Sequence, residues 1–203
     1  MKLYNSVGPN PHVVRMFAAE KGVPLETVTL DLRAGENRQP AHLARNPMGQ
    51  TPALELDDGS VVTEITAICE YLDELAPTPV LIGATPAERA KTRMWTRRID
   101  LNICEPMANG FRFAEGYPMF KDRVTCIPEA AAPLKGIAQK NLKWLDGELA
   151  NRDFVAGDAL TLADILLFAF LAFGAVVGQP LDPANTHLGA WFERMKARPS
   201  AAA

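Results

Sequence analysis

Asn46 to Glu64 reads NPMGQTPALELDDGSVVTE, and this stretch decides the fold of the first third of the chain. Two short β-prone runs, 53–56 and 60–62, flank Asp58-Gly59, a dipeptide typical of tight hairpin turns. Thr51-Pro52 comes directly before the first run, where a residue that cannot donate to a strand ladder is tolerated. A cis bond there would leave the Thr51 backbone N–H and C=O free to pair with an extended peptide.

The residues after this hairpin predict a helix. Ile68, Tyr71, Leu72 and Leu75 recur at the i, i+3, i+4, i+7 spacing of one apolar face. The N-terminus of a helix presents unpaired N–H groups and a partial positive charge, which together favour a bound carboxylate. The sequence therefore predicts a backbone clamp for a peptide with an anion site beside it.

These two segments resemble motifs of the cytosolic glutathione S-transferases, bacterial type. Residues 46–54, NPMGQTPAL, are similar to the family's N-P-x-G-x-x-P-x-L, and residues 63–72, TEITAICEYL, resemble its E-S-x-A-I-x-x-Y-L. Residues 157–165 and 191–200 are also similar to the family's C-terminal motifs, so the resemblance spans nearly the whole chain.

The resemblance implies a binding role for several residues of the quoted stretch. Gln50 should meet the glycine or cysteine end of glutathione, and Thr51, before Pro52, should pair with its cysteinyl backbone. Glu64 and Ile65 should hold the γ-glutamyl end, with Glu64 facing the ammonium group. Ile65 stands where the family usually has serine, so its N–H, or the hydroxyl of the next residue, must replace that contact.

The resemblance also places the group that activates the thiol between the first strand and the first helix. Pro9 occupies the usual serine or cysteine position and has neither a hydroxyl nor an N–H, so it cannot serve. Three candidates remain: Asn10, Ser6 and Tyr4. Pro9-Asn10 resembles the nu class, in which an asparagine contacts the thiol. The alternative roles are a helix cap for Asn10, a loop hydroxyl without a catalytic role for Ser6, and core packing for Tyr4.

Other candidate residues lie further from these motifs. Arg38 and His42 could approach the glycine carboxylate of glutathione, although we expect them to be plain surface residues. Phe111 and Phe113 belong to an aromatic segment that could line an apolar pocket for an electrophile between the domains, or fill the core.

The order of predicted elements gives an α/β plus all-α fold class: an N-terminal thioredoxin-like domain followed by an all-helical glutathione-transferase C-terminal domain. Strands are expected at 3–4 and 25–30, and a helix runs from Asn10 as N-cap to Lys21. A short irregular helix is expected at 40–44. Prolines mark a linker, so the predicted domains are 1–76 for glutathione, 77–86 as linker, and 87–203 for the electrophile.

The second domain shows no convincing strand pattern. Helices are expected at 87–110, with a kink at Pro106, and at 128–149, 162–177 and 187–196. Thr161 and Asp164 approximate a capping box at the start of the third of these helices. Its apolar run, 165–177, is too short to span a membrane and predicts a helix buried on all sides.

Composition limits the other classes of function. The 203 residues are 48% hydrophobic with a net charge of −3, so no basic excess points to nucleic acid or to a membrane surface. Three separated cysteines and the absence of an apolar leader indicate the reducing cytoplasm. Three dispersed histidines lack metal-ligand spacing, so no metal is expected. The family resemblance implies glutathione as a co-substrate.

The leading hypothesis is a glutathione S-transferase that conjugates the glutathione thiolate to small hydrophobic electrophiles, with a detoxification role. A glutathione-dependent disulfide reductase is the enzymatic alternative, because glutathione itself supplies the sulfur chemistry. A non-catalytic binding module with the same fold is the third, and the missing serine is its main support. The resemblance also implies a homodimer.

Overall fold

The computed structural model describes residues 1–203. Its contacts divide the chain into two compact units. The first comprises Met1–Leu81 together with Pro199–Ala203, and the second comprises Ile82–Arg198.

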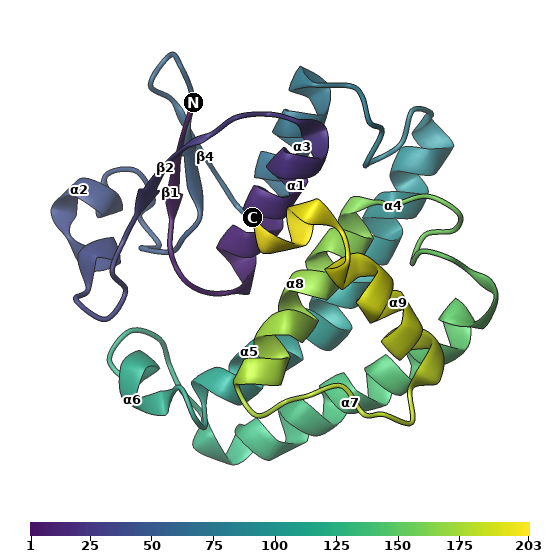
Figure 1. Ribbon diagram of the computed structural model, residues 1–203. Helices are drawn as coiled ribbons and strands as arrows, with labels where there is room; N and C mark the ends of the chain where they lie inside the picture. Colours follow the sequence, from purple (N-terminus) through teal and green to yellow (C-terminus); the bar gives the residue numbers. More distant parts are fainter. The chain divides into compact units, whose positions relative to one another are not determined.

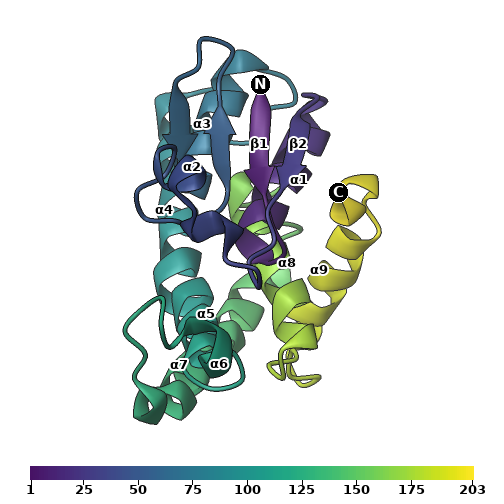
Figure 2. The ribbon, with the colours of Figure 1, turned by 90° about the vertical axis from the view of Figure 1, so that its left-hand side faces the viewer.

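The first unit is a four-stranded sheet with helices on both sides (Figure 1). The strand order is β2-β1-β3-β4, in which β1 and β2 are parallel and the other pairs are antiparallel, and Figure 2 shows β1 beside β2. Helices α1 and α3 pack together on one face, and α2 lies on the other. The elements are β1 (Lys2–Asn5), α1 (Pro9–Lys21), β2 (Glu26–Thr29), η1 (Glu36–Arg38), α2 (Pro40–Leu43), β3 (Ala53–Glu55), β4 (Val61–Thr63) and α3 (Ile65–Leu75).

Apolar side chains of the sheet, α1 and α3 fill the core of this unit. Leu3, Phe17, Leu54, Ile68 and Leu72 are fully buried, and each such side chain contributes roughly 1.5–3 kcal/mol through burial. The predicted apolar face of α3 is therefore confirmed at its centre. Leu75, the last residue of this predicted face, is exposed because the helix ends there.

The C-terminal residues belong to the first unit, which the sequence did not predict. A short 3-10 helix, η5 (Pro199–Ala202), contacts α1. His12 Nε2 lies 3.0 Å from the carbonyl oxygen of Ala201, and the Ser200 hydroxyl donates to Glu20. Burial lowers the pKa of His12, a shift that the Ala201 carbonyl opposes.

The second unit is entirely helical, as predicted. Its elements are α4 (Pro86–Ile99), a π-helical segment η2 (Asp100–Cys104), α5 (Glu105–Arg112), α6 (Tyr117–Phe120), η3 (Pro128–Ala130), α7 (Ala131–Glu148), η4 (Leu149–Asn151), α8 (Leu162–Val176) and α9 (Thr186–Lys196). Figure 1 shows α5 running beside α7, and α9 beside α8.

A helix irregularity was predicted at Pro106, but the structure has it a few residues earlier, as the π-helical segment Asp100–Cys104. Because proline has no N–H, it cannot bond the carbonyl four residues before it, and that carbonyl belongs to Asn102, within the π-helical segment. The Asn102 carbonyl accepts a hydrogen bond from the Asn141 side chain of α7 at 3.1 Å instead. The irregularity thus precedes the proline, which itself lies in the first turn of α5.

Helix α8 is buried from Leu162 to Leu171, whereas Val176 near its end is 80% exposed. The expected bond from the Thr161 N–H to Asp164 is present at 3.0 Å. The carboxylate also accepts from the Val155 N–H and from the Trp191 indole, so one buried side chain ties the start of α8 to the preceding loop and to α9. No helix of the structure is long and apolar enough to cross a membrane.

Candidate functional site

The register of the sheet brings the two sequence motifs to one end of it. Tyr4 lies opposite Ala53, and Ala53 lies opposite Thr63. Because β3 is antiparallel to both neighbours, the residues after β1, before β3 and after β4 all leave the sheet at the same end. Ser6, Thr51 and Glu64 are therefore neighbours in the fold, although the sequence separates them.

The loop before β3 carries the predicted peptide clamp. The Thr51-Pro52 bond is cis, the condition that the clamp required, and the Thr51 N–H and C=O have no hydrogen-bond partner in the chain. The Thr51 hydroxyl lies 2.5 Å from that of Ser6. This contact joins the loop after β1 to the clamp and leaves the Thr51 backbone available to an extended peptide.

Side chains of η1 and α2 hold the carbonyl groups just before the clamp. Asn37 donates to the Gly49 carbonyl at 2.6 Å, and Arg38 donates to that of Met48 at 3.2 Å. The Gln50 carbonyl lies 2.8 Å from His42 Nε2. Gly49 has φ 62, a conformation that residues with a Cβ rarely adopt, and an added Cβ would lie 2.8 Å from the Arg38 guanidinium, which would have to move.

The expectation that His42 is a surface residue is wrong, because its side chain is only 2% exposed. Arg38 is half-buried and its guanidinium contacts the loop. The Gln50 side chain is exposed and makes no hydrogen bond within the chain, so its amide is available to a ligand.

The start of α3 lies beside this clamp. Glu64 is its N-cap residue rather than part of the first turn, and it has φ 67 and ψ 125. It is the one residue other than glycine with a positive φ, a conformation that costs roughly 1–3 kcal/mol and is concentrated at functional sites. Its side chain is exposed and does not cap the helix, and Ile65 is the first helical residue.

The start of α1 differs from the sequence-based expectation. The helix begins at Pro9, its N-cap is Gly8 with φ 122, and no side chain caps it. Asn10 is therefore a half-buried residue of the first turn, and the prediction that it caps the helix is wrong. Proline is well suited to the first helical position, and the helix begins at Pro9 rather than at Pro11. The Asn10 amide makes no hydrogen bond within the chain.

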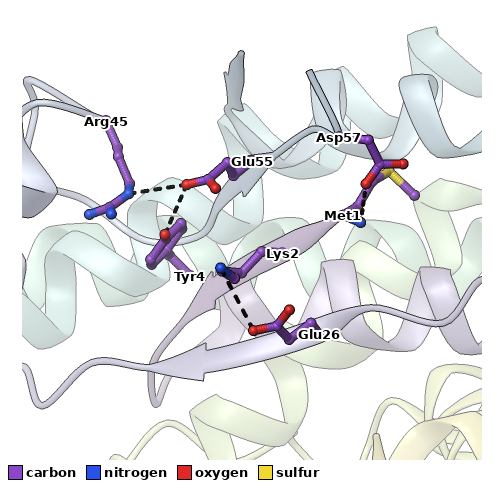
Figure 3. A network of polar contacts seen from close by, with 7 residues as sticks. All are labelled: Met1, Lys2, Tyr4, Glu26, Arg45, Glu55 and Asp57. Atoms are coloured by element: carbon purple, nitrogen blue, oxygen red, sulfur yellow. Dashed lines mark hydrogen bonds and ion pairs between the residues drawn. The ribbon is translucent and has the colours of Figure 1, made fainter. Parts of the chain in front are cut away.

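The other two candidates for contacting the thiol are engaged elsewhere. Ser6 is 2% exposed, and its hydroxyl also lies 3.2 Å from the Val7 carbonyl. Tyr4 is 6% exposed and donates to Glu55 at 2.9 Å, with the Arg45 guanidinium 4.2 Å from its ring centre (Figure 3). Burial, and then the bond to Glu55, raise the pKa of the Tyr4 phenol.

The aromatic candidates lie in the helical unit. Phe111 packs edge-on against Phe173, with ring centres 5.2 Å apart, and against Phe120 at 6.1 Å. All three rings are half-buried, so they form an aromatic cluster of this unit outside its fully buried core. Phe113, just after α5, is half-buried and takes part in no such ring contact.

Two residues that hold the clamp loop were not predicted from the sequence. Asn37 and Asn46 are 6% and 3% exposed, and Asn46 donates to the Gln50 carbonyl at 3.0 Å. Asn46 also accepts from the Met48 N–H, closing the loop on itself. Its position directly before a proline in the motif was the available signal, whereas nothing in the pattern marked Asn37. No group of His, Cys, Asp and Glu side chains in the structure could hold a metal ion.

Comparisons with known proteins agree with this geometry. Residues 1–74 match the family model described as the glutathione S-transferase N-terminal domain, and residues 127–199 match that of the C-terminal domain. Glutathione S-transferase 2 of Saccharomyces cerevisiae is 35% identical over 208 residues, which cover 98% of this chain and 87% of the relative.

Solved structures show the same similarity. The crystal structure of Gtt2 from S. cerevisiae has a TM-score of 0.93 at 35% identity and covers 100% of this chain and 99% of its own. A sphingomonad glutathione S-transferase complexed with glutathione has a TM-score of 0.83 at 29% identity and covers 100% and 96%. The thioredoxin-like and all-helical fold prediction is confirmed, and the chain belongs to the glutathione S-transferase family, whose members are enzymes.

Proposed function

We propose that this protein binds glutathione along the clamp and transfers its thiolate to small hydrophobic electrophiles. One observation carries the proposal: the unpaired Thr51 backbone lies at the same end of the sheet as the N-terminus of α3. A tripeptide laid along Thr51 would place its cysteinyl backbone there and its γ-glutamyl carboxylate at the helix N-terminus.

The contacts at each end of the tripeptide follow from groups without partners in the chain. Glu64 would attract the γ-glutamyl ammonium as a charged acceptor. The N–H of Ile65 is one of the four donors that no helical carbonyl can satisfy. The Gln50 amide would meet the glycine or cysteine end of the peptide.

The thiol needs a donor, because the thiolate is the nucleophile. Asn10 is our candidate, since its amide is not used by the helix cap and it lies in the first turn of α1. The positive end of that helix adds to the stabilisation of a nearby anion. Tyr4 and Ser6 are weaker candidates, because a carboxylate and a neighbouring hydroxyl already engage them.

The test is a calorimetric titration with glutathione, followed by conjugation of a chlorinated nitrobenzene. We expect micromolar to low-millimolar binding and measurable conjugation. Glu64→Gln keeps the shape of the side chain but removes its charge, and it should weaken binding without lowering stability. Lack of binding at millimolar glutathione would refute the proposal, and binding without any turnover would select the non-catalytic module.

A glutathione-dependent disulfide reductase is the second candidate. It is favoured by the absence of a free hydroxyl beside the proposed thiol donor, since Ser6 is buried against Thr51. Faster reduction of a small disulfide by glutathione than conjugation of the nitrobenzene would select it. The sulfur chemistry would then come from two glutathione molecules, so no cysteine of the chain is required.

We further propose a cytoplasmic homodimer with a detoxification role and domains at 1–76 and 87–203 joined by the linker 77–86, with the last residues, Pro199–Ala203, packed on the first domain. The cytoplasm is supported by three free cysteines, of which Cys69 and Cys104 are buried. Burial raises the pKa of both thiols well above its usual range, so they are unreactive. The dimer is supported by the family alone, and light scattering tests it.

A further inference from the structure

Apolar packing does not explain why polar side chains are buried beneath the clamp. Asn37, His42 and Asn46 are each at least 94% buried in a small unit where burying polar groups is costly. All three direct donor atoms at carbonyl groups of one short loop. Their role therefore lies in the conformation of that loop.

The donors act on successive peptide groups. Arg38, Asn37 and His42 contact the carbonyl groups of Met48, Gly49 and Gln50, in that order along the loop. With all three carbonyl groups turned toward η1 and α2, the peptide planes from 48 to 51 have a fixed orientation. The next N–H in the chain, that of Thr51, is the donor of the proposed clamp.

We propose that His42 is a positioning residue for glutathione: its Nε2–H holds the Gln50 carbonyl and so orients the Gln50–Thr51 peptide that binds the tripeptide. This inference rests on the proposed function. The bonded carbonyl and the Thr51 N–H belong to the same planar group, so rotating one rotates the other. His42 acts only through this peptide and does not touch the ligand.

The hydrogen bonds also assign the tautomer of His42. A carbonyl oxygen can only accept, so Nε2 must carry the proton. The other ring nitrogen, Nδ1, is buried and has no hydrogen-bond partner, which is compatible with an unprotonated nitrogen. The Tyr4 ring and the imidazole pack edge-to-face, with ring centres 6.2 Å apart.

Three substitutions separate this role from simple packing. His42→Gln places its amide nitrogen the same number of bonds from Cα as Nε2, so it can still donate to the Gln50 carbonyl. His42→Asn places its amide at the level of Nδ1 and falls short. His42→Phe keeps the ring shape and removes the donor. In every variant Asn46 continues to donate to the Gln50 carbonyl, so that oxygen is never left unsatisfied.

The measurements are the glutathione dissociation constant by calorimetry, and KM and kcat for conjugation. We expect His42→Phe and His42→Asn to weaken glutathione binding about five- to tenfold, the equivalent of one hydrogen bond. In both, kcat at saturating glutathione should stay within about twofold. His42→Gln should retain most of the wild-type affinity.

Leu72→Ala serves as the matched control for lost stability. Leu72 is fully buried in α3, and its side chain is not part of the clamp. If this variant melts earlier but binds glutathione normally, destabilisation alone does not weaken binding.

Unchanged affinity in His42→Phe, or equal affinities in His42→Asn and His42→Gln, would overturn the inference. Lack of glutathione binding by the wild-type protein would instead refute the proposed function, so the two failures are distinguishable.

Discussion

Asn10→Ala is the variant that best tests the proposed chemistry, because the structure separates its two possible roles. The helix N-cap is Gly8, and the Asn10 amide makes no hydrogen bond in the chain. Capping asparagines contribute about 1 kcal/mol to stability. That contribution is absent here, so the substitution should leave the free energy of unfolding unchanged within about 0.5 kcal/mol.

The thiolate should respond much more strongly than the fold. A hydrogen bond to a charged group contributes about 1.5–3 kcal/mol, which corresponds to about one to two units in the pKa of bound glutathione. We expect the pKa of the bound thiol to rise by this amount in Asn10→Ala. Conjugation well below that pKa should slow about ten- to hundredfold, with most of the binding affinity retained.

The assay is an ultraviolet titration of thiolate absorbance with glutathione bound, run beside a denaturant melt. Ser6→Ala is the matched control, because its hydroxyl contacts Thr51 and lies in the same loop. An unchanged thiol pKa in Asn10→Ala would refute the assignment. Complete loss of the thiolate in Ser6→Ala alone would make the chain a displaced serine-type enzyme.

Three further predictions concern charge and burial. Glu64→Gln should raise KM for glutathione about tenfold with an unchanged melting temperature, measured by steady-state kinetics and calorimetry; an equal KM would remove Glu64 from the site. Asp164→Ala leaves the Val155 and Trp191 donors unsatisfied and should cost about 3 kcal/mol or more in a denaturant melt, whereas a loss below about 1 kcal/mol would contradict that account. The hydrogen bond from Tyr4 lowers the pKa of Glu55. The stability that ionised Glu55 contributes is therefore fully present above the ordinary glutamate pKa of about 4.3 and is lost as pH falls through the lowered pKa. Glu55→Gln should flatten the acid side of the plot of stability against pH, and parallel plots for the variant and the wild type would count against this.

The sequence predicted the elements that bury a regular apolar pattern. The hairpin at Asp58-Gly59 and the apolar face of α3 follow from periods of two and 3.6 residues, which hold wherever one side of an element faces a core. The end of α1 was predicted for the same reason, with Gly22 in the left-handed conformation after Lys21. Its beginning was misplaced, since two prolines and an asparagine offered competing starts and only the structure selects Gly8.

The candidate site was predictable only in part, because the groups at its centre, the unpaired N–H and C=O of Thr51, belong to the backbone. The motif placed Thr51 and Glu64 at one end of the sheet, but it gave no sign of the positive φ at Glu64, which depends on how β4 joins α3. The role of Tyr4 was also open, since a tyrosine at that strand can contact the thiol or pack in the core, and its bond to a carboxylate was not predicted. The partner, Glu55, lies on the neighbouring strand at a position fixed by the register.

The burial of His42 could not be predicted from side-chain polarity alone. Polar residues without an apolar period are expected at the surface, because that is where most of them occur, and His42 was assigned there on this ground. The loop that His42 contacts explains its burial, because backbone carbonyl groups that are shielded from water need hydrogen-bond donors. The carbonyl groups of Met48, Gly49 and Gln50 accept from Arg38, Asn37 and His42, respectively. The burial of His42 is thus explained by a hydrogen bond to the loop that follows α2 rather than by a hydrophobic pattern in the sequence around it. The same hydrogen bonds orient the Gln50–Thr51 peptide, whose N–H has no partner in the chain and is the donor of the proposed clamp.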